Sequence, residues 1–158
     1  MRKLLLITTS LLALSACGFQ LKGQQPYDRL PYQAWRVDGG ELQQPLENAL
    51  RRADAQSVSA SDAQAAITVT HLGTERNVLT ITRAASINEY MLVLRVTAQA
   101  SRNGEPLGEP MEIVVRRPME YADSEILGKG EEEAMIWQDM RRDAAQQIVR
   151  RLGFLKAQ

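Results

Sequence analysis

A long amphipathic segment near the carboxyl end constrains the fold more than any other feature of this chain. Its apolar side chains recur at the spacing of one helical face: Trp137, Met140, Ala144, Ile148 and Leu152. Glutamates at 131–133 precede the segment and Arg150 and Arg151 end it, so both charge clusters complement the helix dipole. The pattern predicts an α-helix over residues 131–152, ended by Gly153.

The middle of the chain is rich in residues that favour β-strands. Three segments show this pattern: residues 65–83, 88–101 and 111–118. The first segment is long, and we expect one strand with a bend or bulge near Gly73. Asn103-Gly104 predicts a tight turn between the second and third segments.

The region before these strands predicts one more strand and one more helix. Residues 32–37 resemble a short strand that Asp38-Gly39-Gly40 closes, and residues 44–55 carry apolar side chains at helical spacing. Pro45 suits the first turn of this helix, where its missing N–H costs nothing. The order β-α-β-β-β-α predicts an α+β fold with two helices packed on one face of a mostly antiparallel four-stranded sheet.

The amino-terminal residues carry the features of a secretory signal peptide. A basic head is followed by an apolar run of 11 residues, 4–14, and then by the small residues Ser15 and Ala16. At 1.5 Å per residue this run is too short to cross a hydrocarbon core of ~30 Å as a helix. The stretch Leu14-Ser15-Ala16-Cys17 resembles the lipobox of bacterial lipoproteins, in which the cysteine thiol receives a lipid. An ordinary signal peptide with a chance cysteine is the alternative.

These features divide the chain into a signal peptide, residues 1–16, a lipidated tether, residues 17–31, and one domain, residues 32–158. The whole chain has 19 basic and 19 acidic residues, and cleavage would leave 17 against 19, a net charge of −2. A chain without a basic field is a poor partner for nucleic acid. Gly18 after Cys17 favours the outer membrane, because Asp at this position favours inner-membrane retention.

The sequence shows no catalytic or metal-binding pattern. His71, the single histidine, lies in a predicted strand without a carboxylate within three residues, so a surface role is favoured over a base. Asp38-Gly39-Gly40 lacks the Lys-Ser/Thr of a phosphate loop. The glutamates at 131–133 are better explained as a helix start than as a cation site. We therefore expect no enzyme, no metal and no cofactor beyond the covalent lipid on Cys17.

Three segments together resemble the LptE family of lipopolysaccharide-assembly lipoproteins. The first is Cys17-Gly18-Phe19-Gln20-Leu21-Lys22-Gly23, which is similar to the family's mature amino terminus. The second is residues 88–94, NEYMLVL, which resembles a Glu-Tyr pair followed by an apolar run. The third is residues 135–152, which resembles the last helix of the family. The resemblance covers nearly all of the mature chain.

This resemblance implies an outer-membrane lipoprotein that plugs the large β-barrel LptD, helps the barrel to assemble, and binds lipopolysaccharide during its delivery to the outer leaflet. Such a protein sits on the periplasmic side and within the barrel lumen. Two family positions tied to ligand binding fall on Arg83, at the tip of a hairpin, and on Lys129, in a Gly128-Lys129-Gly130 loop.

The strands of this chain depart from the family pattern near Arg83 and at Pro118. Ala84-Ala85-Ser86 follows Arg83 where the family often carries Asn-Gly, and Pro118 stands where the related strand often continues. A strand that contains proline is expected to end early or to lie at a sheet edge. The alternative function is that of an accessory periplasm-facing lipoprotein of another envelope assembly machine, which binds protein only.

Overall fold

A computed structural model describes residues 30–81, 87–121 and 126–156. Strand β1 (Ala34–Asp38) leads through the 3-10 turn η1 (Gly40–Leu42) into helix α2 (Gln43–Arg52). Three long strands follow: β3 (Ala65–Ile81), β4 (Ile87–Arg102) and β6 (Met111–Glu120). Two short strands, β2 (Gln56–Ser57) and β5 (Glu105–Pro106), lie between them, and helix α3 (Ile126–Leu152) comes last.

The strands form one mixed sheet in the order β2-β1-β3-β4-β5, with β6 also paired to β4. β3, β4, β5 and β6 pair antiparallel, whereas β1 is parallel to both β2 and β3. The α+β class with two helices is confirmed, but the predicted count of four strands is too low. The two additional strands have two residues each, too few for any periodicity. β1 and β3 are joined through α2, and such a crossover brings two strands into parallel pairing.

β3 is a single long strand, as predicted, but its irregularities do not fall at Gly73. The register with β4 shifts between Val69 and His71 and again on either side of Thr80, while Gly73 stays paired with Arg95. The Thr70 hydroxyl donates a hydrogen bond to the Thr97 carbonyl, 3.2 Å away, at the first shift. A β-branched residue with its own hydrogen bond therefore marks the bulge.

β6 runs past Pro118 and ends at Glu120, so the expectation of an early end is wrong. Pro118 lies opposite Met91 of β4, the one strand in the described part of the chain that pairs with β6. The other edge of β6 is free of strand partners among the described residues. An edge strand tolerates a missing N–H, which confirms the edge position expected for this proline.

Both helices differ in length from their predicted ranges. α2 ends at Arg52, three residues before the predicted end, and Asp54 adopts φ 56° just beyond it. Before α2, Gly39 is tightly enclosed, since a Cβ there would lie 2.7 Å from the Gln43 nitrogen. The Gly39 N–H donates to Gln43 Oε1, 2.9 Å away. The diglycine therefore starts a helix and does not line a phosphate site.

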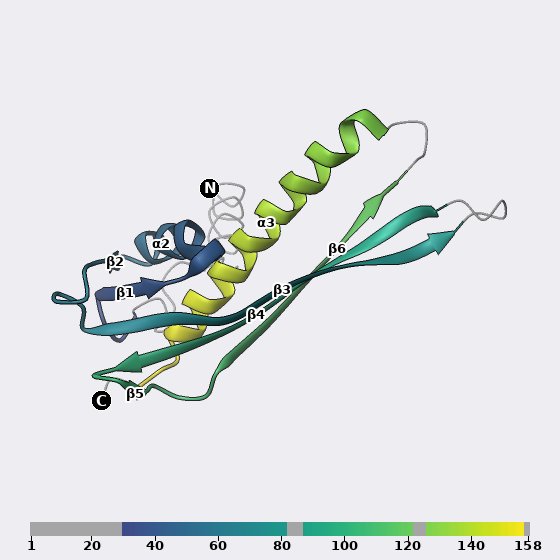
Figure 1. The fold of residues 1–158 in the computed structure, drawn as a ribbon. Helices are drawn as coiled ribbons and strands as arrows, with labels where there is room; N and C mark the ends of the chain where they lie inside the picture. The colour runs from purple at the N-terminus through teal and green to yellow at the C-terminus, as the bar shows by residue number, and fades with distance from the viewer. Residues whose placement is uncertain (1–29, 82–86, 122–125, 157–158) are drawn as a thin grey trace, which may run out of the picture.

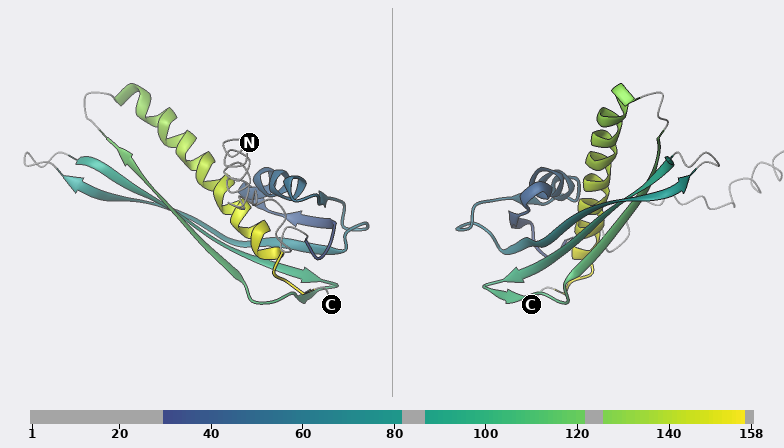
Figure 2. Two further views of the ribbon diagram at one scale, coloured as in Figure 1. Left: turned by 180° about the vertical axis from the view of Figure 1, so that it is seen from behind. Right: turned by 45° about the vertical axis from the view of Figure 1, so that its right-hand side comes forward.

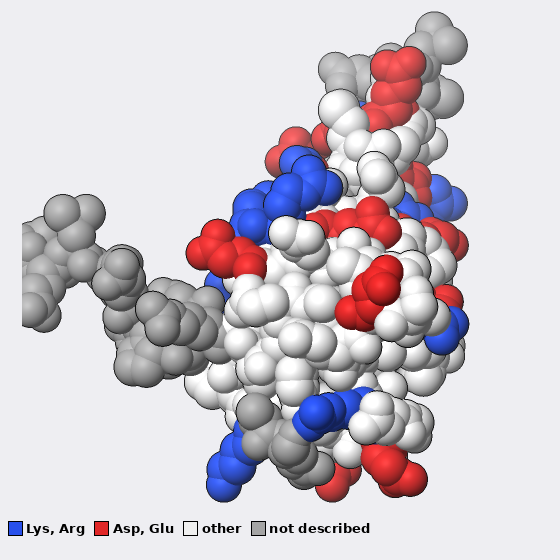
Figure 3. Space-filling model, turned by 90° about the vertical axis from the view of Figure 1, so that its left-hand side faces the viewer, with Lys and Arg blue, Asp and Glu red and all other residues white. Residues whose placement is uncertain are grey.

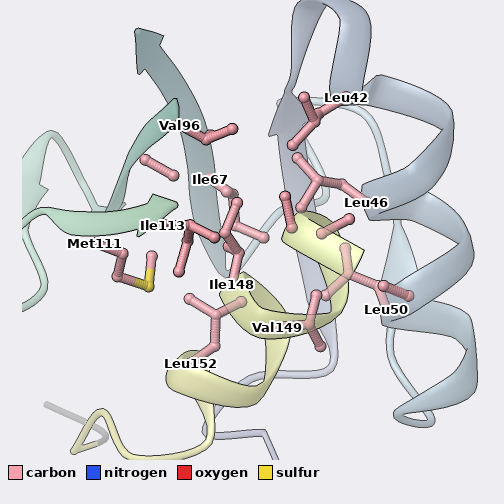
Figure 4. Close-up of a cluster of buried hydrophobic side chains, with 14 of the residues drawn as sticks. Leu42, Leu46, Leu50, Ile67, Val96, Met111, Ile113, Ile148, Val149 and Leu152 are labelled. Carbon is pink, nitrogen blue, oxygen red and sulfur yellow. The ribbon is translucent and has the colours of Figure 1, made fainter. Parts of the chain in front are cut away.

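One hydrophobic core lies between the two helices and one face of the sheet. Figures 1 and 2 show α2 and α3 on the same side of the strands. Figure 4 shows Leu46 and Leu50 of α2 directed toward α3, and Ile148 and Leu152 of α3 directed toward the strands. All four are completely buried. Burying side chains of this size contributes roughly 1.5–3 kcal/mol each.

The predicted face of α3 is confirmed where the helix crosses this core. Met140, Ala144, Ile148 and Leu152 are all completely buried, and Trp137 is partly buried against the core. Leu30, near the end of the predicted tether, also packs into the core, as does Tyr32 at the start of the predicted domain.

Candidate functional site

One end of the molecule extends beyond this core, and we call it the distal region. It comprises residues 74–81 of β3, 87–91 of β4, 118–121 at and just after the end of β6, and 126–137 of α3. In Figures 1 and 2 the amino end of α3 and the far ends of β3 and β4 project away from α2. Val78 and Leu79 of β3 and Met135 of α3 are exposed by 52%, 46% and 61%. The distal region therefore offers polar and apolar side chains to a ligand.

The opposite end of the molecule also carries charges of both signs. Figure 3 looks at the end built from β1, β2 and α2, and there the Lys and Arg side chains alternate with Asp and Glu around uncharged surface. This mixture agrees with the nearly balanced composition of the chain.

Arg76 of β3 connects the sheet to α3 in the distal region. Its Nη1 donates to Glu133 Oε2 across 3.2 Å, and its guanidinium carbon lies 4.8 Å from the centre of the Tyr90 ring. Arg76 pairs with Leu92 of β4, so Tyr90 is its diagonal neighbour on the same face of the sheet. Because successive side chains of a strand point to opposite faces of the sheet, the position of Arg76 in β3 places its side chain on the face that α3 covers.

Aromatic side chains support this ion pair from both sides. The Tyr90 and Tyr121 rings meet edge to face, with centroids 5.3 Å apart and planes at 75°. On the helix, Trp137 Nε1 donates to Glu133 Oε1 across 3.1 Å. Glu133 therefore accepts hydrogen bonds on both of its oxygens, and Tyr90 is held in place beneath the guanidinium.

Lys129 lies within α3, so its predicted position in a loop is wrong. The helix begins at Ile126 and continues through both glycines that flank Lys129. Each glycine costs about 1 kcal/mol relative to alanine inside a helix, and the rest of α3 offsets this cost. The Lys129 ammonium lies 2.8 Å from Glu132 Oε2, and its side chain is only 15% exposed.

Lys129 and Glu133 are four residues apart and therefore lie on the same face of α3, one turn from each other. Since Arg76 contacts Glu133, the fold brings two cations, Arg76 and Lys129, to neighbouring turns of the helix. Each cation has a glutamate partner, Glu133 for Arg76 and Glu132 for Lys129. The site is thus a set of paired charges on an aromatic support.

Two sequence-predicted residues lie outside the described part of the chain. Cys17, the predicted lipidation site, is one of them, and Arg83 is the other. The pairing of β3 with β4 reaches Ile81 and Ile87, so a β3–β4 hairpin is present as expected. The roles of both residues stay predictions.

The remaining candidates from the sequence do not form a reactive site. His71 is an exposed residue of β3. Among the described residues, no group of three or more His, Cys, Asp or Glu side chains could hold a metal ion. No helix in the described part of the chain is both long and apolar enough to span a bilayer.

A second concave surface separates α2 from α3 on the helical side of the molecule. It is an open groove of about 600 Å³, lined by Gln44, Asn48 and Gln138 among others. At one end Arg141 Nη2 donates to Glu41 Oε2 across 2.6 Å, and Arg141 Nε is buried without a hydrogen-bond partner. The groove is lined mostly by polar residues of α2 and of the middle of α3, outside the distal region.

The sequence analysis missed Arg76 and Tyr121. The sequence indicated one part of this site: Glu133 and Trp137 are four residues apart, so their side chains lie on the same face of the helix. Nothing in the sequence states which residues of β3 and β4 face each other, because a bulge shifts the register. The position of Arg76 next to Tyr90 and Glu133 therefore follows only from the register of β3 against β4 and from the packing of α3.

Comparison with known proteins agrees with this architecture. Residues 29–152 match the family model described as LptE, Lipopolysaccharide-assembly. The LPS-assembly lipoprotein LptE of Pectobacterium atrosepticum is 30% identical over 156 residues, which cover 94% of this chain and 83% of that protein.

Solved structures show the same fold. The uncharacterized lipoprotein B from Nitrosomonas europaea superposes with a TM-score of 0.70 at 29% identity, covering 86% of this chain and 90% of that one. A minor lipoprotein from Acinetobacter baumannii gives a TM-score of 0.67 at 22% identity, with 79% and 95% covered. At that identity the second likeness concerns the fold alone.

Proposed function

Because the chain belongs to the LptE family of lipopolysaccharide-assembly lipoproteins, we propose that it plugs the outer-membrane β-barrel LptD and helps that barrel to assemble. We also propose that it binds lipopolysaccharide during delivery to the outer leaflet. The observation that carries the proposal is the family match over residues 29–152, which spans both helices and every strand of the sheet.

The shape and surface of the fold support a plug. In the described part of the chain both helices cover the same face of the sheet, and on the other face β6 presents Glu112, Val114 and Arg116 to solvent. The lumen of a large outer-membrane barrel is polar and wet. A rigid sheet with charged side chains on its free face suits such a lumen better than an apolar surface would.

We propose a lipid anchor because residues 1–16 have the pattern of a lipoprotein signal peptide followed by Cys17. Lipid on Cys17 would hold the protein to the periplasmic side of the outer membrane beside the barrel, since two or more acyl chains give stable attachment. Cys17→Ala is expected to incorporate no radioactive palmitate and to remain as an uncleaved precursor. Equal labelling of the variant and the parent would contradict the lipobox.

The partner is tested by purification from outer membranes. A tag on the carboxyl end, extraction in mild detergent and identification by mass should recover a large LptD-like barrel in nearly equal amount. A lipidated, abundant protein that brings down no barrel would instead favour the alternative, an accessory lipoprotein of another envelope machine that binds protein only.

Ligand binding is proposed at Arg83 and Lys129, which match family positions tied to lipopolysaccharide. Arg83→Asp combined with Lys129→Asp is expected to weaken binding of labelled lipopolysaccharide while the barrel complex stays intact. An unchanged titration curve would remove both residues from the site.

A further inference from the structure

The contact between Arg76 and Glu133 has the properties of an exchangeable ion pair. The Arg76 side chain is 50% exposed and the Glu133 side chain 24% exposed, with 3.2 Å between Nη1 and Oε2. Ion pairs at such exposure contribute only about 0–1 kcal/mol to stability. The fold therefore loses little when another anion takes the place of the carboxylate.

We propose that Arg76 binds a phosphate group of lipopolysaccharide. In the absence of ligand the Glu133 carboxylate pairs with the Arg76 guanidinium, and the phosphate displaces this carboxylate when it binds. The proposal rests on the lipopolysaccharide binding proposed above. It assigns a ligand role to a residue of β3 well before the β3–β4 hairpin tip.

The chemistry of the two partners favours the exchange. A guanidinium carries five N–H donors in a planar fork that matches two phosphate oxygens at once. The guanidinium carbon lies 4.8 Å from the centre of the Tyr90 ring, so a cation–π contact holds the guanidinium over this ring while solvent reaches half of the side chain. A phosphate monoester carries a charge of about −1.5 to −2 near neutral pH, more than the single charge of a carboxylate. The phosphate is therefore the stronger partner.

The displaced glutamate keeps a partner of its own. Trp137 Nε1 donates to Glu133 Oε1, the oxygen that Arg76 does not contact. Losing Arg76 therefore leaves the carboxylate hydrogen-bonded at the helix surface, where water reaches its second oxygen. This arrangement avoids the penalty of a buried carboxylate without a partner.

The surroundings suit an amphiphilic anion. Lys129 lies one helical turn from Glu133 and is paired with Glu132, so a second cation lies near the one that we assign to phosphate. Exposed apolar side chains lie in the same distal region, Val78 and Leu79 on β3 and Met135 on α3. The distal region thus offers a cation to the phosphates and apolar side chains to the acyl chains of the same ligand.

A purely structural ion pair makes a different prediction from an exchange. If the pair only joins β3 to α3, removing either charge breaks the same contact, and both variants should behave alike. If Glu133 competes with phosphate for Arg76, the two variants must change affinity in opposite directions. The sign of the Glu133 effect therefore decides between the two roles.

The test uses the full lipidated chain in mild detergent and fluorescently labelled lipopolysaccharide. Arg76→Gln should weaken binding roughly tenfold, because it removes hydrogen bonds to a charged group. Glu133→Gln should strengthen binding by up to about fivefold, because it removes a competing ion pair while its amide still accepts from Trp137. Lipopolysaccharide from which the phosphates have been removed should bind the parent and Arg76→Gln equally.

Arg117→Gln is the matched control. Arg117 of β6 contacts Asp143 of α3 at 2.9 Å, with side-chain exposures of 48% and 34%, so it is also a strand-to-helix ion pair. This variant should keep the parent affinity within about twofold, since losing an exposed pair changes a fold by at most about 1 kcal/mol.

Two results would overturn the exchange while lipopolysaccharide binding itself stands: weaker or unchanged binding by Glu133→Gln, or unchanged binding by Arg76→Gln. A parent chain that binds no lipopolysaccharide would overturn the exchange together with the ligand part of the proposed function. Misfolding cannot produce the expected pattern, because an unfolded Glu133→Gln chain would not bind more tightly than the parent.

Discussion

Around Ile148 the helix α3 packs closely against the sheet, whereas Glu133, about four turns earlier, contacts the sheet through an ion pair with Arg76. Ile148 is completely buried among side chains from α2 and from three strands. Glu133 contacts Arg76 in an ion pair that solvent reaches. The same helix is therefore held by burial at one end and by charge and aromatic contacts at the other.

The difference between the two regions is one of energy scale. Apolar burial stabilises by roughly 25 cal/mol per Å² and is lost only when the fold opens. Exposed ion pairs are worth about 0–1 kcal/mol and exchange partners readily. The core region can thus carry the stability of the domain while the distal region stays available to a ligand.

The largest expected effect separates the two regions directly. Ile148→Ala should cost about 2–5 kcal/mol in the free energy of unfolding, because it leaves a cavity in a closed core. Val78→Ala, at a residue 52% exposed in the distal region, should cost less than about 1 kcal/mol. Urea denaturation of both variants measures these costs, and equal losses would contradict the division.

An intermediate effect compares the same substitution at two glycines. Gly104→Ala should destabilise by about 1 kcal/mol, because the β4–β5 turn holds Gly104 at φ 88°. Gly130→Ala in the distal half of α3 should stabilise by roughly 0.5–1 kcal/mol, because alanine is the better helix former and an added Cβ meets no atom within 4 Å. Thermal melting measures both, and changes of the same sign would show that the distal helix does not obey ordinary helix propensity.

The smallest effect concerns an ion pair on the distal strands. The hydrogen bond and charge of Arg95 lower the pKa of Glu75 below its ordinary value of 4.5. A lowered pKa in the folded state means that the pair stabilises above pH 4.5 and that this contribution is lost as pH falls through the folded pKa. Glu75→Gln should melt slightly below the parent at pH 7 and level with it in acid. A gap that persists in strong acid would contradict this assignment.

Much of the core region could be predicted from local patterns. The spacing from Trp137 to Leu152 identified the buried face of α3, and Asn103-Gly104 identified a turn in which both residues adopt positive φ. These features depend on a few neighbouring residues, so a short window of sequence carries them. The strand count and the parallel pairing of β1 were not predictable in this way, since two-residue strands have no period.

The distal site shows what short windows cannot provide. Lys129 was expected in a loop because two glycines flank it, yet α3 continues through both. Arg76 was missed because its importance depends on the register of β3 against β4 and on the approach of a helix 57 residues away in the chain. Such contacts join residues whose separation in the sequence carries no periodic signal.

The amino-acid sequence by itself determined the amphipathic faces, the turns, the absence of a strongly charged field and the resemblance to the LptE family. The tertiary structure alone decided which charges meet, because packing both helices on one face leaves the far ends of the strands and of α3 uncovered. In that uncovered region the pairing of Arg76 with Glu133 follows from strand register and helix position, two quantities that only the assembled fold defines.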